Sequence, residues 1–148
     1  MSVDIIKDYL PWAPSLLTLA GWYLVNAQNN SRERRKEVRS GADRCKALAR
    51  DAAQTAIKYW EGKPDGAAWH VKANLEELEV EIRRFPISKG REELNNRYVD
   101  LVNAIAAEDF ESANMQKKPP TDPIMRCISR TKQALLHEVE CQFERHFN

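Results

Sequence analysis

The most informative absence in this chain is charge at its N-terminal end. No charged residue occurs from Tyr9 to Ser31, and five basic residues then follow within eight positions: Arg32, Arg34, Arg35, Lys36 and Arg39. An uncharged, mostly apolar run with a Lys/Arg-rich flank is typical of a membrane anchor. As a helix, its most apolar part, Tyr9 to Ala27, would be about 28 Å long, close to the ~30 Å hydrocarbon core of a bilayer. We therefore expect one transmembrane helix over residues 9–30.

Aromatic residues mark the two ends of this predicted helix, and the asymmetry of charge predicts its orientation in the membrane. Trp12 lies near one end of the run and the Trp22–Tyr23 pair near the other, where aromatic rings are expected at the level of the lipid headgroups. Residues 1–8 hold one basic residue, whereas residues 32–39 hold five. The positive-inside rule thus predicts a short external tip over residues 1–8 and a cytoplasmic domain over residues 31–148, at the cell (inner) membrane.

Two other interpretations of the run stay open. Val25-Asn26-Ala27 resembles a small-residue cleavage site of a signal peptide, although Asp4 and Asp8 give a poor n-region and the basic cluster would oppose translocation. The run could instead be a buried helix of a soluble protein. It would then need a large core around it, and 148 residues leave little material for one.

Glycine and cysteine are scarce, and their positions exclude several functions. None of the five glycines is arranged to cradle a phosphate, and the three cysteines show no CxxC spacing. Cys45, Cys127 and Cys141 are expected to be free thiols in a cytoplasmic domain. No nucleophile–base pattern is visible either, so the sequence predicts no catalytic, metal or cofactor residues.

A basic face is also missing from the body of the chain. Residues 40–148 contain 17 Lys/Arg and 18 Asp/Glu, whereas a nucleic-acid-binding domain would show an excess of basic residues. We therefore expect no nucleic-acid partner. The basic cluster at residues 32–39 is interpreted as a topology signal that also contacts anionic lipid headgroups.

No stretch alternates in the manner of a β-strand, and the apolar period is near 3.6 residues. The sequence predicts an all-α fold, with a cytoplasmic antiparallel bundle of about four helices over residues 31–60, 66–85, 89–112 and 123–146. Asp65, Ser88 and Asp122 are the expected N-caps. The predicted inward stripes are Val38, Ala42, Cys45, Leu48, Ala49, Ala52, Ala56, Tyr59 and Trp60 in the first helix, Ala68, Val71, Leu75, Leu78, Ile82 and Phe85 in the second, Leu94, Tyr98, Leu101, Val102 and Ile105 in the third, and Ile124, Ile128, Leu135, Val139 and Phe143 in the fourth, where Leu136 and Phe147 flank the stripe.

Two clusters were weighed as metal sites. His137 and Cys141 are four residues apart, as in a zinc-protease helix whose second histidine has become cysteine, but neither His70 nor His146 completes the ligand set. Glu108, Asp109 and Glu111 lack the Glu-x-x-His partners that di-metal bundles use. A small metal-binding enzyme or sensor is thus an alternative, and a membrane-perturbing effector is another.

A second apolar strip lies on the predicted helix 66–85, away from its inward stripe. It consists of Trp69, Ala73 and Val80. Such a strip either packs against a neighbour in the bundle or receives a protein partner or a second copy of the chain. The function predicted from the sequence is therefore that of a membrane-anchored, non-enzymatic interaction or tethering protein, with the lipid bilayer and a protein partner or homo-oligomer as its contacts.

Overall fold

Four α-helices form the regular structure, and the described residues contain no strand. The computed structural model describes residues 13–62, 67–86, 90–107, 110–112 and 116–147. The helices are α2 (Ala13–Trp60), α3 (Ala67–Arg84), α4 (Arg91–Ile105) and α5 (Pro123–Phe147). The prediction of an all-α chain whose four helices pack as a bundle is confirmed.

The chain divides into two compact units, Met1–Glu37 and Val38–Asn148, and the boundary falls within α2. In the first unit the described residues are helical from position 13, and every side chain from Pro14 to Glu37 is exposed. The second unit holds the remainder of α2 together with the other three helices.

The predicted transmembrane helix over residues 9–30 has no support in the described structure. Among the residues that the structure describes, no helix contains an apolar stretch long enough to cross a membrane. Residues 9–12, Trp12 among them, and the predicted tip at residues 1–8 lie outside the described residues.

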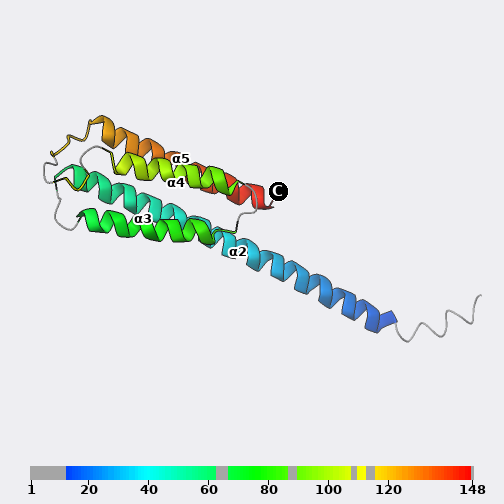
Figure 1. Ribbon diagram of the computed structural model, residues 1–148. Helices are drawn as coiled ribbons and strands as arrows, with labels where there is room; N and C mark the ends of the chain where they lie inside the picture. Colours follow the sequence, from blue (N-terminus) through cyan, green and yellow to red (C-terminus); the bar gives the residue numbers. More distant parts are fainter. Residues whose placement is uncertain (1–12, 63–66, 87–89, 108–109, 113–115, 148) are drawn as a thin grey trace, which may run out of the picture. The chain divides into compact units, whose positions relative to one another are not determined.

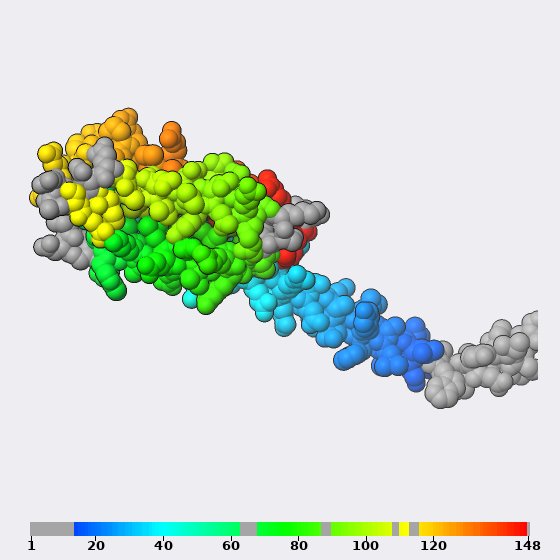
Figure 2. Space-filling model, viewed as in Figure 1, coloured from blue at the N-terminus to red at the C-terminus, as the bar shows by residue number. Residues whose placement is uncertain are grey.

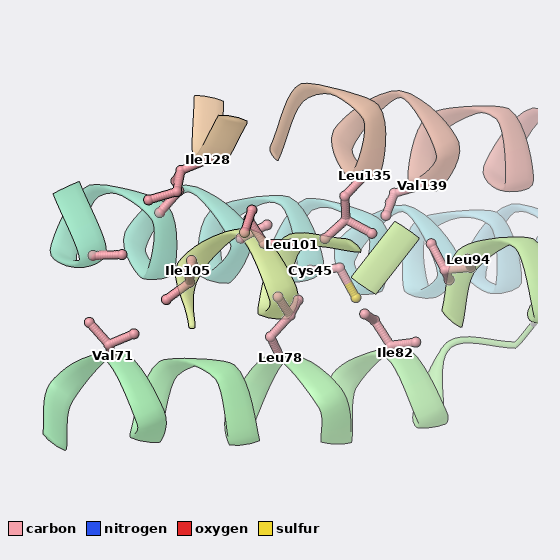
Figure 3. Packing of buried hydrophobic residues seen from close by; sticks show 14 of the residues in the cluster. Cys45, Val71, Leu78, Ile82, Leu94, Leu101, Ile105, Ile128, Leu135 and Val139 are labelled. Atoms are coloured by element: carbon pink, nitrogen blue, oxygen red, sulfur yellow. The ribbon is translucent and has the colours of Figure 1, made fainter. Parts of the chain in front are cut away.

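The second unit is a bundle in which successive helices run in opposite directions (Figure 1). Its part of α2 presents alanines to the centre: Ala42, Ala49, Ala52, Ala53 and Ala56 are all completely or almost completely buried. Side chains this small let neighbouring helices approach closely. The larger core residues come from the other helices, and those of α3 point toward residues of α2, α4 and α5 (Figure 3).

Some helix ends lie where local sequence signals predict them, and others are set by tertiary packing. The Asp122 carboxylate accepts a hydrogen bond from the Ile124 amide at 2.9 Å, so the predicted N-cap of α5 is confirmed. Asp65 and Ser88 lie outside the described residues, and Gly90, at φ 85°, is the N-cap residue of α4.

The predicted helix 89–112 is too long, because α4 ends at Ile105. Beyond it the Phe110 ring packs 4.9 Å from the Tyr59 ring and 6.2 Å from the Trp60 ring, between centroids. Glu111 has φ 64°, and its amide donates to the Tyr59 hydroxyl at 2.9 Å. Burial of an aromatic ring against α2 thus ends the helix where propensity alone would have continued it.

Candidate functional site

The N-terminal segment of α2 exposes an unusual amount of apolar surface. Seven large side chains are between 56% and 73% exposed: Leu16, Leu17, Leu19, Trp22, Tyr23, Leu24 and Val25. At 100° per residue these positions surround the helix instead of forming one stripe. A helix that is apolar on all sides belongs in a lipid or protein environment, so this segment is the first candidate for a binding surface.

The basic cluster that follows is split between two environments. Arg32, Arg34, Arg35 and Lys36 are exposed in the first unit. Arg39 belongs to the bundle, where its guanidinium pairs with Glu140 of α5 and with Asp43, and lies 5.0 Å from the centre of the Phe143 ring. Arg39 therefore has a structural role beside its predicted role as a topology signal, and its partner Glu140 is 101 residues away, beyond the reach of local sequence patterns.

Glu140 is the centre of an ion-pair network that joins α2 to α5. Lys46 donates to its carboxylate at 2.7 Å and also lies 2.9 Å from Asp43. The hydrogen bond from Lys46 and, after it, that from Arg39 lower the pKa of Glu140 against the opposing effect of burial. The Lys46 hydrogen bond likewise lowers the pKa of Asp43. The network therefore holds both carboxylates ionised at neutral pH and fixes α5 on α2.

The strip predicted on the helix 66–85 lies on the outer side of α3. Trp69 is 69% exposed and Val80 is 43% exposed, while Ala73 between them is half-buried. All three lie opposite Val71, Leu78 and Ile82, which are buried in the core. Two exposed glutamates, Glu76 and Glu77, lie on the same side of α3, and the described residues provide no ion-pair partner for either. Figure 2 shows the face of the bundle on which α3 and α4 lie at the surface.

A groove of about 700 Å³ runs along the seam between α4 and α5. Small side chains form it, because Ala104 of α4 and Ala107, two residues beyond the end of α4, line it together with Cys127, Thr131 and Ala134 of α5. Its lining is completed by Arg97, Asp100, Asn103, Pro123, Ile124 and Arg130. α4 and α5 pack directly against each other along this seam, and the sequence of neither helix indicates it alone.

The charges around this groove are unevenly neutralised. Arg97 lies 2.7 Å from Glu93 and 3.6 Å from Asp100. In contrast, Arg130 of α5, which lines the groove, has no ion-pair partner among the described residues. Arg126 also has none, but it lines a separate hollow with Ile57 and Glu61. No acidic residue occurs from Pro123 to His137. The first half of α5 is thus the one stretch of the bundle's described helices that carries several unneutralised cations and no acid of its own.

The thiols and histidines do not form a metal centre in the described part of the chain. Cys141 Sγ lies 3.5 Å from His137 Nε2, so the predicted pair does meet. No third His, Cys, Asp or Glu joins them among the described residues. Glu108 and Asp109 lie outside the described residues, and Glu111 pairs with Lys72. Burial raises the pKa of Cys45 to about 11, so this thiol is unreactive.

A buried polar contact on α5 was also missed from the sequence. Gln142 is completely buried and donates from Nε2 to Glu138 at 2.6 Å and to the Gly90 carbonyl at 3.2 Å. Its Oε1 has no hydrogen-bond partner among the residues that the structure describes. Gln142 lies seven residues after Leu135, on the inward stripe of α5, and that position was the available signal.

Comparison with known proteins gives no relative from which a function could be transferred. No protein-family model, no curated protein and no solved structure matches this chain.

Proposed function

We propose that this protein is a non-enzymatic interaction protein, in which the N-terminal segment of α2 attaches the chain to a membrane and the bundle binds protein. The observation that carries the proposal is the exposed apolar segment from Leu16 to Val25 directly ahead of a basic cluster. Exposed apolar area costs about 25 cal/mol per Å² relative to burial. Seven large side chains on all sides of one helix therefore favour a surrounding apolar environment.

The basic flank favours a lipid environment over a protein one. Arg32, Arg34, Arg35 and Lys36 are exposed in the first unit. Each basic residue near an anionic membrane surface contributes about 1 kcal/mol of attraction, which salt weakens. The order of an apolar segment followed by basic residues also favours a bundle on the cytoplasmic side.

The proposed form of attachment is a single crossing with the N-terminus outside. The stretch from Leu16 to Val25 covers only about 15 Å as a helix, so a crossing must also use residues 9–12. A segment lying in the membrane interface is the competing arrangement, and accessibility of the N-terminus to a protease added outside sealed vesicles distinguishes the two.

The bundle supports a binding role rather than a chemical one. Its ion pairs join helix to helix, and its described cysteines and histidines come together only as the pair His137–Cys141. Two surfaces have exposed side chains that a partner could contact: the outer strip of α3 and the groove between α4 and α5. Attachment to a membrane would raise the local concentration of whatever these surfaces bind.

Flotation with lipid vesicles tests the attachment. The full chain should float with zwitterionic vesicles and more completely with vesicles containing phosphatidylglycerol. Leu24→Glu should reduce flotation strongly, because it places a charge in the apolar segment. Val99→Glu is the matched control, since Val99 is an exposed valine of α4 in the bundle. Equal flotation of the two variants would reject the proposed attachment.

A further inference from the structure

Two surfaces of the bundle expose apolar side chains or charged side chains that have no ion-pair partner among the described residues. On α3 these are an exposed tryptophan, an exposed valine and the glutamates Glu76 and Glu77. On the seam of α4 and α5 they are a hollow of small side chains and Arg130, which lines it and has no ion-pair partner among the described residues. One surface has two exposed glutamates beside apolar side chains, and the other is an alanine-lined groove with an exposed arginine.

We propose that the outer strip of α3 in one copy docks into the α4/α5 groove of a second copy. This inference rests on the proposed binding role of the bundle and names its partner. Charge complementarity selects a second copy, because Glu76 and Glu77 of α3 and Arg130 of the groove have no ion-pair partner among the described residues and are of opposite sign. The exposed Trp69 is the type of side chain that anchors an interface when a partner offers it a pocket.

The distance between the apolar and the charged position is also the same along the α3 strip as along the α5 side of the groove. From Trp69 to Glu76 is seven residues, as from Pro123 to Arg130, or about 10 Å along a helix. With α3 aligned along α5 in this register, Trp69 lies at the apolar end of the groove, formed by Ala107, Pro123 and Ile124.

The same register pairs the remaining positions of the strip. Glu76 and Glu77 reach Arg130, and Val80 lies at Ala134. Ala73 then lies opposite Cys127. Asp100 on the α4 side of the groove opposes an acidic ridge, and its pairing with Arg97 reduces that repulsion.

The two surfaces are different parts of the chain, so the contact is head-to-tail. Each copy has a free groove when its strip is occupied, and a free strip when its groove is occupied. Such a contact continues into a ring or an open chain of copies instead of stopping at a symmetric dimer. One helix in a groove about 15 Å long is a small interface. We therefore expect weak association in solution that membrane attachment would strengthen.

Charge reversal tests the contact in the full chain, kept in a non-ionic detergent. Glu76→Lys/Glu77→Lys disables the strip, and Arg130→Glu disables the groove. Sedimentation velocity should show that the wild type forms larger species as its concentration rises, and each of these two variants alone should associate about tenfold more weakly. Asp51→Lys and Arg50→Glu, at exposed positions of α2, are the matched controls and should associate as the wild type does.

Mixing the strip variant with the groove variant gives the sharpest outcome. The unchanged strip of the second fits the unchanged groove of the first, and the lysines of the reversed strip face the glutamate of the reversed groove, so the mixture should regain the growth that neither variant shows alone. Combining all three substitutions in one chain should restore growth for the same reason. Wild-type association that survives in both variants, no association in the wild type, or no gain in association on mixing would each overturn the proposal.

A disulfide test locates the contact independently of charge. Ala73→Cys, oxidised with copper–phenanthroline, should form a link between copies through the native Cys127. Adding Cys127→Ser should remove the link, whereas adding Cys141→Ser should not. A link that persists without Cys127 would contradict the register. The strip variant and the groove variant should both still float with vesicles, so failed self-docking would be distinguishable from failed membrane attachment.

Discussion

Replacement of Trp60 by phenylalanine probes the packing that positions the ends of α2 and α4. Trp60 is completely buried, and its indole N–H donates to the Ile105 carbonyl at 3.3 Å. Ile105 is the last residue of α4, where carbonyls lack a partner within the helix. The Trp60 carbonyl in turn accepts from the Lys118 amide at 2.8 Å. One side chain and its backbone thus connect α2, α4 and the segment leading to α5.

The expected cost follows from these contacts. Loss of the N–H bond removes about 0.5–1.5 kcal/mol, and a buried carbonyl left unpaired adds about 1–3 kcal/mol when no water replaces the donor. The smaller ring also leaves a cavity among Tyr59, Phe110 and Ile105. We expect Trp60→Phe to lower the free energy of unfolding by about 2–3 kcal/mol.

Trp69→Phe is the matched control, because it makes the same change on the exposed outer side of α3. It should change the free energy of unfolding by less than about 0.5 kcal/mol. Urea denaturation followed by circular dichroism measures both variants through the transition midpoint and slope. Equal stability of the two variants would refute the account of Trp60.

Three further predictions concern other contacts. Glu140→Gln should lower stability at neutral pH by about 1 kcal/mol. Because the folded-state pKa of Glu140 is lowered, the wild type should lose this advantage as the pH falls through that pKa, and a constant difference measured down to acid pH would contradict it. Cys45 should react with a thiol reagent far more slowly than Cys141 in the native protein, and all three thiols should react alike in denaturant; fast native labelling of Cys45 would disprove its burial. Asp122→Ala should cost about 1 kcal/mol of unfolding free energy through loss of the N-cap, an effect that Asp122→Asn should largely avoid.

Much of the bundle could be predicted because helical periodicity is a local property. Ala42, Cys45, Ala49, Ala52 and Ala56 of α2 recur every three or four residues, and each is completely or almost completely buried in the observed core. The N-cap at Asp122 was predictable for the same reason, since its partner is only two residues away.

Features that depend on distant contacts were not predictable. α4 stops at Ile105 because Phe110 packs on Tyr59 and Trp60, which lie about fifty residues earlier in the chain. The pairing of Arg39 with Glu140 and the burial of Gln142 against Gly90 likewise depend on which helices become neighbours. The α4/α5 groove results from small residues on two helices facing each other, and neither helix shows it alone.

The predicted transmembrane helix shows the limit of a charge-based argument. Absence of charge from Tyr9 to Ser31 does not make the whole run apolar, because Asn26, Gln28, Asn29 and Asn30 occupy its end. Amides are costly in hydrocarbon, so the strongly apolar part of the described run is shorter than its uncharged length. The exposed side chains from Leu16 to Val25 are what remains to support membrane attachment.

The central claim, that this apolar segment enters a membrane, is tested most directly at Trp22. Trp22 is 68% exposed in the middle of the segment. The full chain should be bound to vesicles whose acyl chains carry bromine atoms, which quench tryptophan fluorescence on contact. The account predicts strong quenching in the wild type and a clearly smaller quenched fraction in Trp22→Phe. Emission that bromine leaves unchanged, or quenching that is the same in both proteins, would contradict it.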